Sequence, residues 1–159
     1  MKFEAQVKEL PDRFAACVRH VGPYNQIGKG FERIFGWAGP KGLIQFPKTE
    51  VLAFYHDDPE TTAESELRSS ACLTVPEGTE GDGDVETKVI PGGTFAVAHI
   101  EIDASEFGEA WDKLVGEWMP ENGYEPDESR MCYELYLNDH EQHPEKKFIV
   151  DLCEPVRAK

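Results

Sequence analysis

The strongest constraint on the fold of this chain is an internal repeat at an offset of about 80 residues. Four segments of the first half match four segments of the second half in the same order: 13–18 with 94–99, 30–36 with 110–116, 54–60 with 135–141, and 71–73 with 152–154. A single match of this kind arises by chance, but four in one order indicate a duplicated folding unit. We predict one domain over residues 1–159, with repeat one at about 1–75, an exposed connector at about 76–86, and repeat two at about 87–159.

Each repeat has the pattern strand, helix, strand, strand. The helix of the first repeat is predicted because Ile27, Phe31 and Ile34 recur at helical spacing. The predicted elements are strands 13–21, 50–55 and 69–75 with helix 24–37, and strands 93–102, 131–137 and 147–154 with helix 105–119. This pattern predicts an α+β fold in which the tandem duplication forms a pseudo-twofold antiparallel sheet with two helices packed on it. We expect a pocket at the junction of the repeats.

One residue breaks the symmetry of the repeat. Strand 131–137 alternates so that Glu134 shares a face with Cys132 and Tyr136, whereas the matching strand has the small apolar residue Ala53 in place of the carboxylate. A glutamate in mid-strand is unfavourable for sheet formation and costly to bury without a partner. Two interpretations follow: an exposed glutamate on a solvent-facing strand, or a buried glutamate at the base of a ligand pocket.

In the pocket interpretation, Glu134 balances the positive charge of a ligand. Tyr55, Tyr136 and Trp111 are the candidate aromatic walls, and each adds about 0.5–2 kcal/mol through stacking or cation–π contact. Burial would raise the pKa of Glu134 and suit it to general acid–base chemistry. Trp37 and Trp118 are expected in the core, while Trp111 fits either the core or the pocket wall.

Composition narrows the possible partners. The net charge of −15 repels phosphate backbones, so direct nucleic-acid binding is not expected, and it favours either a cationic ligand or simple solubility. No apolar run approaches the roughly 18–20 residues that span a bilayer, and the N-terminus lacks the apolar stretch of a signal peptide. We therefore expect a cytoplasmic protein that does not bind membranes.

The remaining chemistry-bearing residues give no metal, cofactor or catalytic motif. The four cysteines have no CxxC spacing and are expected to be free thiols. His140 and His143 fall in a polar segment that is better explained as a solvated loop than as a metal site. The chain contains no GxSxG, HExxH, Walker-type or GxGxxG motif.

Taken together, these residues resemble the GyrI-like small-molecule-binding family. This family includes the DNA gyrase inhibitory proteins and the effector-binding domains of multidrug-responsive transcription activators. The resemblance covers nearly the whole chain and is carried by HVGPY at 20–24, FYHDDP at 54–59, IPGGTFAVA at 90–98, Trp111, and CYELYLN at 132–138. It implies a ligand pocket with a glutamate at the position of Glu134 and with Tyr55 and Trp111 among its walls. We include Tyr24 with the ligand-binding candidates.

The resemblance leaves three functions open. The first is a stand-alone module that binds hydrophobic, cationic aromatic molecules, since no helix-turn-helix precedes the first strand. The second is a hydrolase that detoxifies cyclopropane-bearing alkylating toxins, with Glu134 and Trp111 as catalytic residues. The third is a protein-interaction inhibitor of DNA gyrase that uses the acidic charge against a basic surface.

Overall fold

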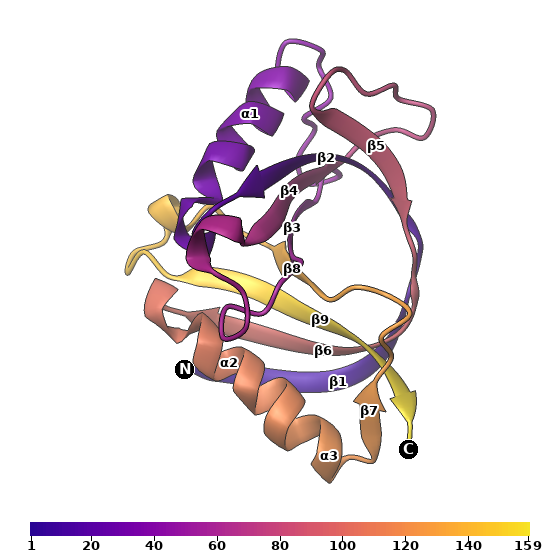
Figure 1. Cartoon of the computed structure of the whole chain (residues 1–159), viewed down its shortest axis with the longest axis vertical. Helices are drawn as coiled ribbons and strands as arrows, with labels where there is room; N and C mark the ends of the chain where they lie inside the picture. Colours follow the sequence, from indigo (N-terminus) through magenta and orange to yellow (C-terminus); the bar gives the residue numbers. More distant parts are fainter. The chain divides into compact units, whose positions relative to one another are not determined.

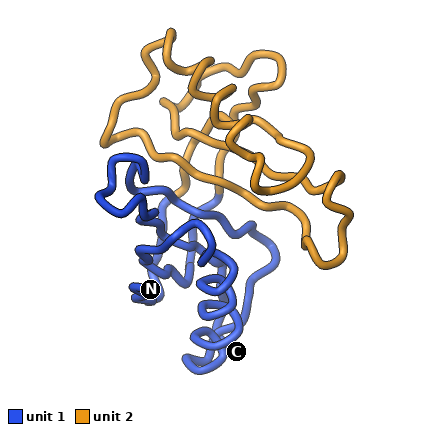
Figure 2. Tube along the Cα trace, turned by 90° about the vertical axis from the view of Figure 1, so that its left-hand side faces the viewer, with its two compact units in different colours: residues 1–11, 91–159 blue, residues 12–90 orange.

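The computed structural model describes residues 1–159 and divides into two compact units (Figure 2). Unit 1 combines Met1–Pro11 with Pro91–Lys159, and unit 2 is Asp12–Ile90. Both units have antiparallel strands and a helix, so the predicted α+β class, with antiparallel strands and two packed helices, is confirmed. No helix has both the length and the apolar character required to cross a bilayer.

Unit 2 is a four-stranded antiparallel sheet covered by one helix (Figure 1). Its elements are β2 (Arg13–Val21), α1 (Gly28–Ala38), β3 (Val51–Tyr55), β4 (Arg68–Thr74) and β5 (Val85–Ile90), and the strands lie in the order β3-β4-β2-β5. The apolar face of α1 buries Ile34 and Trp37 against Ala16, Val18 and Ala71 of the sheet. Trp37 is therefore a core residue, as predicted.

A glycine allows α1 to lie close to its sheet. A Cβ atom on Gly30 would lie 3.2 Å from the Cβ atom of Ala71, which is tighter than ordinary packing. The turn that leads into the helix also depends on a glycine, because Gly22 has a φ of +130°. Gly22 thus permits the turn that leads into α1, and Gly30 permits the close approach of α1 to the sheet.

Unit 1 is built in the same way. Its elements are β1 (Lys2–Leu10), β6 (Gly93–Ile102), α2 (Phe107–Asp112), α3 (Met119–Glu121), β7 (Tyr124–Pro126), β8 (Tyr133–Tyr136) and β9 (Phe148–Ala158). The sheet order is β1-β6-β9-β8, and β7 pairs with the far end of β9. The helix-facing surface of the sheet includes Ala98, Ile100, Val150 and Leu152, which pack with Leu114 of the helix.

The helix of unit 1 changes its winding. A π-helical segment, Lys113–Trp118, joins α2 to α3. The predicted helix 105–119 is therefore one continuous helical element whose central turns are wound as a π-helix. Trp111 and Trp118, on either side of that segment, both pack against the same apolar cluster. Trp118 also stacks on Tyr124, with ring centroids 6.4 Å apart and the planes 3° from parallel. Trp118, predicted to lie in the core, is partly buried and packs against the apolar cluster.

Three strands, β1, β5 and β7, lie outside the predicted pattern. β1 pairs with β6 of the second repeat, and β5 pairs with β2 of the first repeat, so each repeat gives its leading strand to the sheet of the other. For this reason unit 2 runs from residue 12 to residue 90. The sequence had predicted that repeat one ends at about residue 75 and that repeat two begins at about residue 87. β5 also covers the last two residues of the predicted connector. The assignment of 1–159 to a single domain stays a prediction.

Candidate functional site

The carboxylate of Glu134 is buried in unit 1 and held by two aromatic donors. The residue is only 3% exposed. Its Oε2 atom accepts a hydrogen bond from Trp111 Nε1 at 2.8 Å, and its Oε1 atom accepts one from the Tyr136 hydroxyl at 2.6 Å. The interpretation of Glu134 as a solvent-exposed strand residue is therefore wrong. Two of the three aromatic residues predicted to surround this carboxylate contact it directly.

Strand alternation and register place this group under the helix. In the β8–β9 ladder, Glu134 lies opposite Leu152 and Tyr136 lies opposite Val150. Leu152 and Val150 belong to the apolar cluster that the helix covers, so Glu134 and Tyr136 also face the helix. Trp111 projects from α2 onto this same surface and joins the helix to the sheet through its hydrogen bond.

Two opposing effects act on the ionisation of this carboxylate. Burial disfavours an ionised carboxylate, but two hydrogen-bond donors directed at its two oxygens favour the ionised form. The rings that supply these donors are themselves half-buried and carry π faces that attract cations. Chemically, the group can act as a counter-charge for a cation flanked by aromatic surface.

Replacing Trp111 by phenylalanine tests the hydrogen bond to Glu134. We expect Trp111→Phe to lower the free energy of unfolding by about 1–3 kcal/mol, because the buried carboxylate loses a donor that solvent does not replace. Urea denaturation monitored by circular dichroism measures the change. Trp118→Phe is the matched control, since it removes a similar ring area on the same helix. Equal losses in both variants would assign the effect to ring packing.

Tyr24 and Tyr55 form a second aromatic pair, within unit 2. Their ring centroids are 4.8 Å apart in an edge-to-face arrangement, and both rings are half-buried. The Tyr24 hydroxyl donates to the Asp57 carbonyl oxygen at 2.5 Å and accepts from the Asp57 N–H at 2.9 Å. Burial raises the pKa of Tyr24 above its ordinary value. The sequence-predicted site residues thus form two groups: Glu134, Trp111 and Tyr136 in unit 1, and Tyr24 and Tyr55 in unit 2.

A charged pair anchors the loop beside Tyr24. The Arg68 guanidinium binds the carboxylate of Asp57 in a bidentate manner at 2.8 and 3.0 Å. This hydrogen bonding lowers the pKa of Asp57 to about 2, so the carboxylate is ionised throughout the neutral range. Asp57 therefore holds Tyr24 through its backbone and Arg68 through its side chain.

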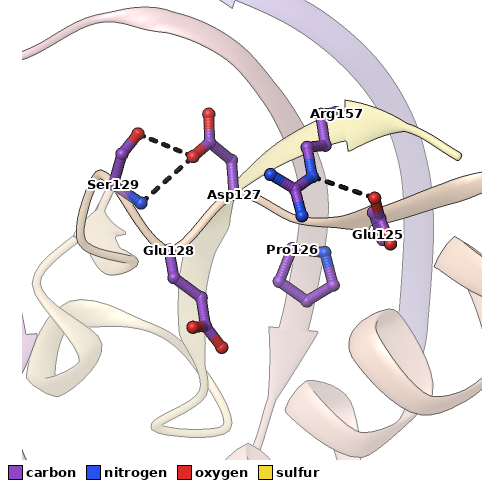
Figure 3. A pocket seen from close by; sticks show the side chains of 6 residues that line it. All are labelled: Glu125, Pro126, Asp127, Glu128, Ser129 and Arg157. Atoms are coloured by element: carbon purple, nitrogen blue, oxygen red, sulfur yellow. Dashed lines mark hydrogen bonds and ion pairs between the residues drawn. The ribbon is translucent and has the colours of Figure 1, made fainter.

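The structure defines a surface cavity in each unit. A cavity of about 340 Å³ in unit 2 is lined by Pro23, Tyr24, Asn25, Pro59, Glu64 and Leu67. A cavity of about 410 Å³ in unit 1 is lined by Glu125, Pro126, Asp127, Glu128, Ser129 and Arg157 (Figure 3). In the second cavity Arg157 pairs with Glu125 at 2.9 Å, and Asp127 accepts two hydrogen bonds from Ser129. Of the predicted site residues, only Tyr24 lines either cavity.

A second acid, the half-buried Glu154, is missing from the sequence prediction. Its carboxylate interacts with the thiol of Cys132, and burial raises the pKa of Glu154 to about 7. The signal was present in the sequence, because Glu154 follows Leu152 by two residues and therefore shares its face of β9.

All four cysteines are free thiols, and no three acidic, histidine or cysteine side chains gather in a way that could hold a metal ion.

Comparisons with known proteins place this geometry in context. The sequence model of the GyrI-like small molecule binding domain matches residues 3–157. The chain is 39% identical over 133 residues to DNA gyrase inhibitor 2 of Dickeya dadantii (strain 3937), covering 81% of this chain and 82% of that protein. The crystal structure of the EcmrR C-terminal domain matches with a TM-score of 0.82 at 20% identity, over 100% of both chains. SAV2435 bound to tetraphenylphosphonium matches with a TM-score of 0.59 at 10% identity, over 97% of this chain and 94% of that chain. At these identities the two solved structures show a shared fold.

Proposed function

The chain belongs to the GyrI-like family of small-molecule-binding domains, and we propose that it binds hydrophobic, cationic aromatic molecules with Glu134 as their counter-charge. The observation that carries the proposal is the buried carboxylate of Glu134, which is held by donors from Trp111 and Tyr136. Burying a carboxylate costs several kcal/mol unless it is compensated. A bound ligand cation would place its positive charge beside this carboxylate and interact with it in a site of low dielectric.

The surroundings of the carboxylate support an aromatic cation in particular. Trp111, Tyr136 and Phe148 all pack at the edge of the apolar cluster of unit 1. Their rings offer stacking and cation–π surface next to the negative charge. The net charge of −15 would also raise the local concentration of cations around the protein. A lipophilic cation, tetraphenylphosphonium, occupies a protein of the same fold.

A titration with ligands of matched shape and different charge tests this function. We expect saturable micromolar binding of the cationic dye rhodamine 6G and at least tenfold weaker binding of a fluorescein, which has a related ring system and negative charge. Fluorescence anisotropy at fixed ionic strength measures both affinities. Equal affinities would show that charge does not select the ligand, and no saturation with either dye would overturn the proposal.

Inhibition of DNA gyrase is a second candidate function. It is favoured by the name of the relative that is 39% identical over most of both chains. An acidic surface, with 31 aspartates and glutamates against 16 lysines and arginines, suits contact with the basic surface of a DNA-binding enzyme.

A supercoiling assay separates gyrase inhibition from ligand binding. We expect the protein to inhibit gyrase in a dose-dependent manner, with inhibition weakening as salt is raised because surface charges are screened. Glu134→Gln should inhibit as well as the wild type, since that side chain is only 3% exposed and cannot form much of a protein interface. Absence of inhibition at a large molar excess would contradict this candidate.

Hydrolysis of cyclopropane-bearing toxins uses the same carboxylate. General acid catalysis would require Glu134 to carry a proton, whereas a counter-charge for a cation must be ionised. Incubation of the protein with an excess of toxin distinguishes them, because a binder saturates at one equivalent while a hydrolase converts many.

A further inference from the structure

Glu154 lies on the same sheet surface as Glu134. In the ladders of β9, Glu134 is opposite Leu152 and Glu154 is opposite Ala96 of β6. Since Leu152 and Glu154 are two residues apart, both acids face the helix. Diagonal neighbours of this kind are about 7–8 Å apart across a sheet. The two carboxylates therefore flank one patch of the helix-covered surface of unit 1.

Cys132 lies between the two acids. It is two residues before Glu134 along the strand segment, and its thiol interacts with the carboxylate of Glu154. Burial, with both nearby negative charges, raises the pKa of Cys132 to about 12, so the thiol remains protonated and acts as a weak hydrogen-bond donor. This contact is independent evidence that Glu134 and Glu154 act on the same small region.

Glu154 has no cationic partner in the protein. The groups that act on it are Cys132, which donates to it, and Glu128, which repels it. Its neighbour in β6 is Ala96, and Leu114, Trp118 and Met119 of the helix contribute apolar atoms to the cluster above this surface. Glu134, by contrast, is held by two strong donors. The two carboxylates are thus unequal: one is fixed and the other is half-buried and weakly compensated.

We propose that Glu154 is the second carboxylate of the Glu134 site and that it selects aromatic ligands carrying two positive charges. A dication would place one charge near Glu134 and the other near Glu154, with its aromatic body packed over Cys132. This inference rests on the proposed function, because it assumes that ligands reach the Glu134 surface. It goes further by assigning the ligand class and by adding a residue that determines specificity.

Protonation of Glu154 should control this selection. The pKa of Glu154 is raised to about 7, so its ionised fraction rises from about one-tenth at pH 6 to about nine-tenths at pH 8. The titratable groups that act on it, Cys132 and Glu128, do not compensate the change: Cys132 stays protonated, and Glu128 is an acid. Dication affinity should therefore increase by up to about tenfold between pH 6 and pH 8, while monocation affinity changes little.

A pair of closely matched ligands tests the proposal. Methyl viologen is a bipyridinium dication, and N-methyl-4-phenylpyridinium is its monocationic isostere. Isothermal titration calorimetry at pH 8 should show Glu154→Gln binding the dication about tenfold more weakly than the wild type, with less than a twofold change for the monocation. Glu117→Gln, on the exposed side of the same unit, is the control for loss of one surface charge and should behave as the wild type.

Two further readouts separate a binding role from a structural one. In the wild type, dication binding at pH 7 should release a fraction of a proton, seen as a dependence of the binding enthalpy on the buffer, and Glu154→Gln should abolish this release. Glu154→Asp should restore part of the dication preference. For stability the sign is fixed by the raised pKa: Glu154 holds an extra proton in the folded state between about pH 4.5 and 7, so its contribution to stability is greatest below that range and falls as pH rises through it. Glu154→Gln should remove this fall in urea unfolding.

The outcomes distinguish the two proposals. If neither ligand binds the wild type, the proposed function fails and this inference fails with it. If both ligands bind, and Glu134→Gln weakens both but Glu154→Gln weakens neither selectively, the proposed function stands and the inference is overturned. Loss of both ligands in Glu154→Gln together with a lowered urea midpoint at pH 5.5 would show a structural role and would also overturn it.

Discussion

Glu134→Gln should weaken the binding of rhodamine 6G tenfold to a hundredfold, which corresponds to about 1.4–2.8 kcal/mol. Glutamine keeps the size of the side chain but removes the charge that balances the ligand. Loss of one partner of a buried charged pair has a large effect because the other charge stays desolvated. Fluorescence anisotropy titrations of the two proteins, at the same ionic strength, measure the change.

Two controls limit the interpretation of that result. Glu109→Gln removes one exposed acid from the same helix as Trp111 and should leave the affinity within twofold. Fluorescein should bind the Glu134→Gln variant no more weakly than it binds the wild type, because only a cation uses the carboxylate. If the cationic dye binds Glu134→Gln and the wild type equally, Glu134 is not the counter-charge, and a protein partner such as gyrase becomes the leading explanation.

Leu114→Ala should lower the free energy of unfolding by about 2–5 kcal/mol. Leu114 is 0% exposed and lies in the π-helical segment, where it packs with Ile100, Val150 and Leu152 of the sheet. Truncation leaves a cavity at the contact that docks the helix, and solvent cannot fill an apolar space of this kind. Urea denaturation gives the change in midpoint at an unchanged slope.

The same substitution should also weaken ligand binding, because Trp111 reaches Glu134 from the helix that Leu114 anchors. Glu117→Ala, an exposed position in the same π-helical segment, should change stability by less than about 0.5 kcal/mol. A loss as large in Glu117→Ala would show that the effect of Leu114→Ala is not specific to core packing, because alanine does not lower the helix propensity of this segment.

The sequence predicted more of the local structure than of the long-range pairing. β2 and β6 have the predicted bounds of 13–21 and 93–102, because their alternating patterns end at turn residues on both sides. β1 and β5 lie at sheet edges and were missed, although residues 2–7 alternate between exposed and half-buried side chains, which is itself a strand pattern. Their exchange between repeats depends on contacts between residues that are far apart in the chain.

The candidate site shows the same division. Alternation along strand 131–137 predicted that Glu134 and Tyr136 share a face, and that is the observed arrangement. The alternation did not decide whether that face is buried or exposed to solvent, because either face of an antiparallel strand can be solvated. Glu154 was missed because the predicted strand ends at that residue, whereas β9 continues to Ala158 and keeps Glu154 within the sheet.

By itself, the sequence determined the duplication, the positions of β2, β6 and the two helices, and the single carboxylate that interrupts the symmetry, because these are properties of neighbouring residues and of their spacing. Only the tertiary structure decided that the repeats exchange their leading strands, that Glu134 is buried and bonded to Trp111, and that Glu154 faces the same surface. These features depend on which strands pair and which face the helix covers. Non-local packing selects among several pairings that one hydrophobic pattern allows.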